Sequence, residues 1–119
     1  LTTEVKVNAK MFINSIERTS LLITDRLKSP LRCVFDENLI RISTVTSLGT
    51  ANDRLYAQTE GNRVEIGFNN RFLLDALRAC DIEEVKITLN GPLSPITIVP
   101  PDGDNFLFLV LPVRLKNEN

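Results

Sequence analysis

The segment VEIGFNNRFLLDAL (residues 64–77) joins a strand pattern to a helix pattern, and the organisation of the chain follows from it. Asn69 stands at the junction, where its short side-chain oxygen can accept hydrogen bonds from the free amides of a first helical turn. The pattern occurs twice, because EVKVNAKMFINSI (residues 4–16) matches residues 65–77 with its apolar residues in register and Asn8 over Asn69. The sequence therefore predicts an internal repeat of strand, cap and helix.

Strand patterns of period two follow each predicted helix. After the first helix they cover residues 31–35, 40–43 and about 53–59, and after the second they cover 85–89, 96–99 and 106–113. Each half is then β-α-β-β-β, with the repeats at about residues 4–60 and 63–115. Two such units side by side predict one α+β domain over residues 1–119, with a continuous, mainly antiparallel sheet that carries both helices on one face.

The composition is typical of a single globular domain. The chain has 119 residues, 43% hydrophobic and 24% charged, and a formal net charge of −1, so a domain that grips nucleic acid tightly by itself is not expected. Cys33 and Cys80 lie in apolar segments and form no Cys-x-x-Cys pair, which predicts buried thiols in a reducing cytoplasm. The start at Leu1, without an initiator Met or a signal-peptide pattern, suggests a fragment or a processed product.

Catalytic chemistry is not expected from this sequence. The chain has no histidine, which removes the commonest general base and a favoured metal ligand, and it contains no nucleophile motif and no phosphate-binding Gly-rich loop. We therefore expect no catalytic residues, no metal and no cofactor. An enzyme with an unrecognised site is the weakest of the alternatives.

Two surfaces stand out as candidates for binding. The predicted helices carry polar stripes, Lys10, Asn14, Glu17 and Arg18 on the first and Arg71, Asp75 and Arg78 on the second. Such stripes indicate either ordinary solvated faces or a weakly basic surface that lies near a phosphate backbone. The segment 106–113 is apolar at every position, so one face of this strand must be covered by another domain, a partner peptide or the chain's own tail. The alternative is a strand buried on both sides within the domain.

Several segments resemble one family. Residues 64–69, 72–77, 94–96 and above all LVLPVRL (residues 109–115) are similar to the C-terminal domain of the bacterial sliding clamp, the beta subunit of DNA polymerase III. The resemblance implies the third of three like-folded domains in a chain that dimerises into a ring around duplex DNA. It also implies a non-catalytic processivity factor of DNA replication, cytoplasmic and nucleoid-associated. The implied partners are duplex DNA, bound without sequence preference, the polymerase III alpha subunit, the clamp loader and repair polymerases, with a homodimer at full length and no membrane.

The resemblance also assigns roles to residues of this chain. Helix residues that would face DNA are Lys10, Asn14, Arg18, Arg71 and Arg78. The pocket for short linear motifs of partners would be formed by Leu109, Leu111, Pro112, Val113, Arg114, Leu93, Pro95, Asn69 and Phe72. Phe72 departs from the tyrosine of some relatives and lacks its hydroxyl. Leu21 and Leu22 would lie in the subunit interface, whereas their alternative is the core of the first helix.

A second function remains open at this point. The chain could be a small non-catalytic protein-interaction module whose terminal strand takes part in a fixed interface, with no role at DNA. Two further repeats of this domain upstream in the encoding gene would favour the clamp, and a lone domain would favour the module.

Overall fold

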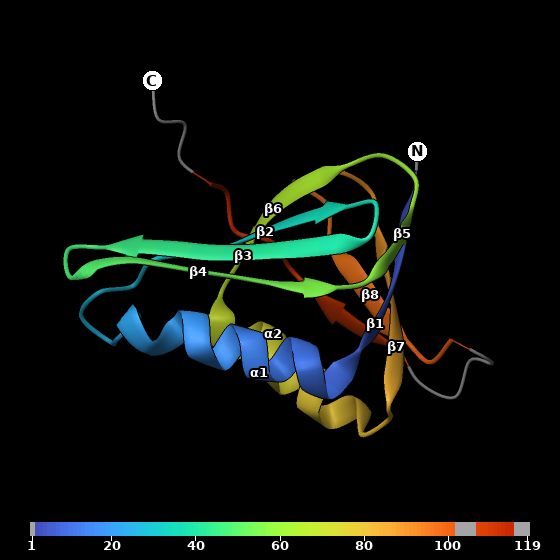
Figure 1. Ribbon diagram of the computed structural model, residues 1–119, viewed down its shortest axis with the longest axis horizontal. Coiled ribbons are helices and arrows are strands. Elements are labelled where there is room, and N and C mark those ends of the chain that lie inside the picture. The colour runs from blue at the N-terminus through green and yellow to red at the C-terminus, as the bar shows by residue number, and fades with distance from the viewer. Residues whose placement is uncertain (1, 102–106, 116–119) are drawn as a thin grey trace.

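The computed structural model describes residues 2–101 and 107–115, in which the same order of elements occurs twice (Figure 1). The first half contains β1 (Thr3–Asn8), α1 (Ala9–Thr19), β2 (Leu31–Asp36), β3 (Leu39–Thr46) and β4 (Gly49–Tyr56). The second half contains β6 (Val64–Phe68), α2 (Asn70–Cys80), β7 (Glu84–Leu89), β8 (Ile96–Val99) and β9 (Phe108–Val110). A 3₁₀ helix, η1 (Ser20–Leu22), follows α1, and a short strand, β5 (Gln58–Glu60), follows β4. The predicted α+β class with two helices and antiparallel strands is confirmed.

The strands form two sheets, which corrects the expectation of one continuous sheet. One sheet has the order β5-β1-β7-β8-β9, the other has the order β4-β3-β2-β6, and every neighbouring pair is antiparallel. The first strand of each half pairs with a strand of the other half, β1 with β7 and β6 with β2. Each half therefore completes the sheet of the other.

Joining the two sheets into one would require β1 to pair with β6, but a short segment already occupies the outer edge of each of these strands. β5 continues from β4 and pairs with the outer edge of β1, where Glu4 lies opposite Glu60. At the equivalent place after β9, the Val113 amide donates to the Gly67 carbonyl on the edge of β6, at 2.8 Å. Because both edges are occupied, β1 and β6 cannot pair with each other, and the two sheets stay separate.

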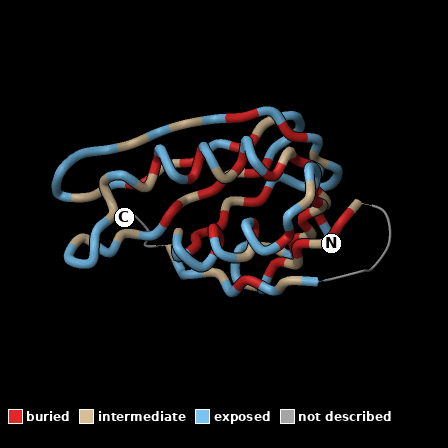
Figure 2. Tube along the Cα trace, turned by 90° about the horizontal axis from the view of Figure 1, so that it is seen from below, coloured by how far each residue is buried: buried red, intermediate tan, exposed pale blue. Residues whose placement is uncertain are grey.

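Both helices begin at the predicted asparagines. The Asn8 side-chain oxygen accepts from the Met11 amide at 2.9 Å, and the Asn69 oxygen accepts from the Arg71 and Phe72 amides at 3.0 and 3.1 Å. Both helices lie on the same side of the strands in Figure 1, and buried and exposed positions alternate along them in Figure 2. This alternation is the physical basis of the layered core, because each helix has one apolar face to bury.

The core lies between the helices and the two sheets. Phe12 of α1 is fully buried and its ring meets the Phe35 ring edge-on, with 6.4 Å between centroids. Cys33 and Cys80 are free and buried, as predicted, and burial raises the pKa of both thiols. Within the described residues, no helix is long and apolar enough to cross a membrane.

Two predicted strands have different bounds in the structure. The strand expected at 53–59 begins earlier, at Gly49, and is interrupted at Ala57, where the chain passes from one sheet to the other. Most of β4 is exposed, so its first half has no apolar alternation to detect. The strand expected at 106–113 is β9, Phe108–Val110, because the chain then leaves β8 and crosses to β6. Residue 106 lies outside the described residues.

Candidate functional site

The end of the chain presents an apolar surface. Leu109 and Leu111 are 65% and 71% exposed, and Val113 is also exposed, whereas Val110 between them is buried. We call Leu109, Leu111 and Val113 the C-terminal apolar surface. Their exposure excludes the alternative of a strand buried on both sides within the described part of the domain.

The neighbouring strand contributes to this surface. β8 pairs with β9 so that Thr97 lies opposite Leu109 and Ile96 opposite Val110, and Pro95 and Leu111 each follow directly beyond the last pair of this ladder. Leu93, two residues earlier, is also exposed. Pro95 therefore lies at the end of β8 that pairs with the terminal segment. Pro112 is half-buried and has no amide to donate, which suits the point where the chain changes sheets.

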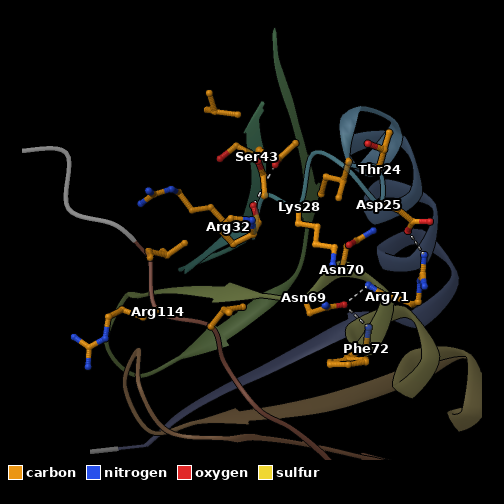
Figure 3. Close-up of a pocket in the computed structure, with 17 residues that line it drawn as sticks. Thr24, Asp25, Lys28, Arg32, Ser43, Asn69, Asn70, Arg71, Phe72 and Arg114 are labelled. Carbon is orange, nitrogen blue, oxygen red and sulfur yellow. Dashed lines mark hydrogen bonds and ion pairs between the residues drawn. The ribbon is translucent and has the colours of Figure 1, made fainter. Parts of the chain in front are cut away.

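A groove lies beside the C-terminal apolar surface and encloses about 790 Å³ (Figure 3). Its walls come from the loop between η1 and β2, the facing ends of β2 and β3, the start of α2 and the terminal segment. Four of the nine predicted pocket residues line it, namely Asn69, Phe72, Val113 and Arg114. The other five, Leu93, Pro95, Leu109, Leu111 and Pro112, are outside this groove, on the adjoining surface.

Asn69 and Phe72 hold different positions at the rim. The Asn69 oxygen is occupied by the two amides of the first turn of α2, so this residue acts on the site by fixing where the helix starts. Phe72 is on that first turn and 62% of it is exposed, which leaves its ring free to contact a ligand. Asn69 therefore fixes the first turn of α2, and Phe72 is an exposed apolar side chain on that turn.

Gly67 lies where the terminal segment packs against β6, and the sequence pattern alone assigned it no role. A Cβ atom there would lie 2.6 Å from the Val113 carbonyl oxygen and 2.6 Å from a Leu115 methyl carbon. Only a residue without a side chain lets the terminal segment approach β6 so closely. The signal was present in the quoted VEIGFN segment, where a glycine interrupts a strand.

The residues predicted to face DNA are exposed on the helices, and their cations are largely paired. Arg18 binds Asp53 at 2.8 Å, Arg78 binds Glu17, and Arg71 lies 3.6 Å from Asp25. Lys10, Asn14 and Arg78 line one shallow groove between α1 and α2, and within the described residues Lys10 has no ion pair. Positive charge on this face is therefore moderated by carboxylates of the same chain.

Asp53 is the best-connected of these carboxylates. Burial by itself raises the pKa of Asp53. Hydrogen bonds donated by Ser15 at 2.8 Å and by Arg18 lower this pKa by more than burial raises it, so the net shift is downward. Ser15 is fully buried in α1 and Asp53 is in β4, so this contact also ties the helix to the edge strand of its sheet. Asp53 remains ionised at neutral pH and holds Arg18 in place.

Leu21 and Leu22 lie in η1 rather than in α1, which ends at Thr19. Leu21 is 80% exposed, so the alternative of a helix-core residue is wrong for it, whereas Leu22 is half-buried. An exposed leucine in a short turn is available for contact with another chain. Separately, no group of three potential metal ligands from His, Cys, Asp and Glu gathers within residues 2–101 and 107–115.

Among solved structures, this architecture is that of sliding-clamp domains. The chain matches the DNA polymerase sliding clamp of Bacillus subtilis with a TM-score of 0.91 and 30% identity, over 97% of this chain and 31% of that one. It matches the DNA polymerase III beta subunit of Thermotoga maritima with a TM-score of 0.90 and 29% identity, over 96% and 31%. A Bartonella birtlesii sliding clamp solved with bound griselimycin matches with a TM-score of 0.88 and 25% identity, over 95% and 30%.

Sequence relatives agree with the structural ones. The beta sliding clamp of Staphylococcus epidermidis is 30% identical over 110 residues, which are 91% of this chain and 29% of that protein. The family described as DNA polymerase III beta subunit, C-terminal domain, matches residues 1–114. The chain therefore belongs to this family, and the resemblance inferred from the sequence is confirmed. It spans less than a third of the length of these relatives.

Proposed function

We propose that this chain is the C-terminal domain of a ring-shaped sliding clamp that acts as a processivity factor in DNA replication. In this role it catalyses no reaction. The ring encircles duplex DNA, and its partners are held to the template because they are bound to the ring. The observation that carries the proposal is the C-terminal apolar surface, which exposes Leu109, Leu111 and Val113 on a domain of the clamp family.

The exposed leucines can bind the apolar side chains of short linear motifs in partner proteins. These partners are the polymerase III alpha subunit, the clamp loader and repair polymerases. Burying one leucine side chain contributes about 1.5–2 kcal/mol, so two or three such contacts support weak, exchangeable binding of a peptide. Arg114 and Phe72 extend the site on the side of the groove. Weak binding suits a clamp, because successive partners must replace one another on the same surface.

The helix face suits attraction to duplex DNA without a tight grip. Lys10, Arg18 and Arg78 are exposed on this face, and Arg18 and Arg78 pair with Asp53 and Glu17, whereas Arg71 lines the groove at the start of α2. A phosphate that approaches a paired arginine must compete with a carboxylate, which weakens each contact. A closed homodimeric ring obtains its hold from topology, so weak contacts allow it to move along DNA. Leu21 would lie at the contact between the two subunits.

The peptide surface is testable on this chain. We expect saturable amide shifts at Leu109–Arg114 and near Pro95 when the ¹⁵N-labelled chain is titrated with a short peptide that contains Gln and Leu. Leu111→Ala should weaken binding roughly tenfold, because it removes about 1–2 kcal/mol of burial. Leu111 is 71% exposed, so the fold should be unchanged.

A matched control is Leu48→Ala, since Leu48 is a similarly exposed leucine on the turn between β3 and β4. It should bind the peptide as the unmodified chain does. Equal affinity of the Leu111→Ala and Leu48→Ala chains would contradict the assignment of the surface. If the chain shows no shifts, the same titration on the full-length protein decides whether the site needs the preceding domain or does not exist.

A further inference from the structure

The groove beside the C-terminal apolar surface carries an excess of positive charge. Its lining includes Lys28, Arg32, Arg71 and Arg114 against the single carboxylate of Asp25. The whole chain has a formal net charge of −1, so this concentration of cations is local. A concave surface of one sign favours ligands of the opposite sign.

These cations differ in how far they are neutralised. Arg32 is paired with Glu65, whereas Arg71 lies 3.6 Å from Asp25 with both side chains mostly exposed, at 75% and 92%, so water screens that contact. Within the described parts of the chain, Lys28 and Arg114 have no ion pair.

The open cations lie on opposite walls of the groove. In Figure 3 the Lys28 side chain extends across the hollow toward Asn69 and Asn70 at the start of α2, whereas Arg114 lies on the terminal segment at the other side, with its guanidinium directed away from the hollow. The first turn of α2 contains no acidic side chain, so the positive end of the helix dipole adds to the same field.

The rest of the lining indicates a peptide rather than a nucleic acid. Ile23, Pro30 and Val45 line the groove together with serine and threonine side chains, and such a mixed wall can bury peptide side chains as well as pair with their charges. Contacts to a nucleic-acid backbone are mainly polar, so these apolar residues would gain little from it. The groove is also continuous with the C-terminal apolar surface through Val113, and Phe72 stands on its wall.

We propose that this groove receives an acidic segment of the same protein partner whose apolar residues occupy the C-terminal apolar surface. The inference rests on the proposed function, because the apolar residues anchor the partner. Lys28 and Arg71 contribute charge to the acidic segment inside the groove, and Arg114 lies at its edge, beside the C-terminal apolar surface. Partners that carry acidic residues next to their apolar motif are thereby distinguished from partners that do not.

The test compares two peptides of equal length on the ¹⁵N-labelled chain at low ionic strength. Both contain the same Gln- and Leu-containing motif, and three residues at each end are Asp and Glu in one peptide and Asn and Gln in the other. The acidic peptide should bind about fivefold more tightly, with shifts at Lys28, Asn70 and Arg71, and the advantage should disappear at high salt.

Lys28→Gln should remove much of that advantage and leave the affinity for the neutral peptide unchanged. Lys6→Gln makes the same change of charge on β1, at an exposed lysine that lines neither groove, and should preserve the advantage.

Three results would overturn the inference. Equal affinities of the two peptides would refute the acidic segment while the proposed peptide surface stands. Binding of neither peptide, to this chain or to the full-length protein, would refute the proposed function and remove the anchor on which the inference rests. A short DNA duplex that displaces the acidic peptide and depends on Lys28 would assign the groove to nucleic acid.

Discussion

Substitution of Gly67 by alanine tests how the terminal segment is held. The added methyl group would lie 2.6 Å from the Val113 carbonyl oxygen, a backbone atom, and 2.6 Å from a Leu115 side-chain carbon. Gly67 is not among the residues with positive φ, so alanine meets no backbone penalty there. The effect of Gly67→Ala is therefore the steric cost of one close approach.

The structure can accommodate the added methyl group in two ways, and the one that costs less free energy determines the measured loss of stability. If the terminal segment moves away, the hydrogen bond from the Val113 amide to the Gly67 carbonyl is lost at about 0.5–1.5 kcal/mol, together with the Leu115 contact. If β6 moves instead, strain in a packed strand costs about 1–3 kcal/mol. We expect release of the segment and a fall of about 1–2 kcal/mol in the free energy of unfolding.

Urea unfolding and amide hydrogen exchange measure the two parts of this prediction. Exchange of the Val113 amide should accelerate roughly tenfold or more in Gly67→Ala, because its acceptor is no longer within reach. Affinity for the Gln- and Leu-containing peptide should fall as well, since Val113 and Arg114 leave their positions.

The control is Gly91→Ala. Gly91 has a φ of +89°, so alanine is strained there, but no atom lies within 4 Å of the added methyl group. This variant should lose stability without any change in exchange of the Val113 amide. Unchanged Val113 exchange in Gly67→Ala, with an unfolding free energy within about 0.3 kcal/mol of the parent, would refute the reasoning.

Three further predictions concern charge and contact between chains. Asp53→Asn should lower the unfolding free energy by about 1 kcal/mol at pH 7. The difference in stability between the two chains should shrink as the pH falls from about 4, because a carboxylate whose pKa is lowered in the folded state stabilises the fold only while it is ionised. Thermal unfolding at a series of pH values measures this difference. Glu17→Gln should free Arg78 and raise the salt concentration at which the chain leaves a duplex-DNA column, while Glu60→Gln, with the same charge change on β5, should raise it less. Leu21→Ser in the full-length protein should give monomers in sedimentation, and persistent dimers would exclude this residue from the interface.

Local features of the fold could be predicted from the sequence because they depend on neighbouring residues. Asn8 and Asn69 were identified as caps since an N-cap needs only a short side-chain acceptor beside the first turn. The buried thiols and the exposed apolar terminal segment were predicted for the same reason, from the composition of short segments. The pairing of β8 with β9, which places Ile96 opposite Val110, comes from the folded structure, and the sequence suggested a shared site for Pro95 and Leu111 only through the family resemblance.

The groove and the pairing of the cations could not be predicted from local patterns. Lys28, Asn70 and Val113 lie in three separate segments, and they line one groove only after the sheets have formed. The spacing of arginines along a helix does not predict which carboxylates they pair with. Arg18, for example, pairs with Asp53, which is 35 residues away in the sequence, on β4. Contacts at such separations are fixed by packing, which periodicity along the chain does not encode.

The sequence by itself determined the repeat, the helix starts, the α+β class and the apolar character of the terminal segment, since these arise from interactions between residues close in the chain. Tertiary structure decided that each half gives its first strand to the sheet of the other, and that the chain crosses to the edge of β6 at Val113. The physical reason is that any free strand edge can accept a partner, and only the folded chain shows which segments reach which edge. At Gly67 the terminal segment packs so close to β6 that there is no room for a Cβ atom.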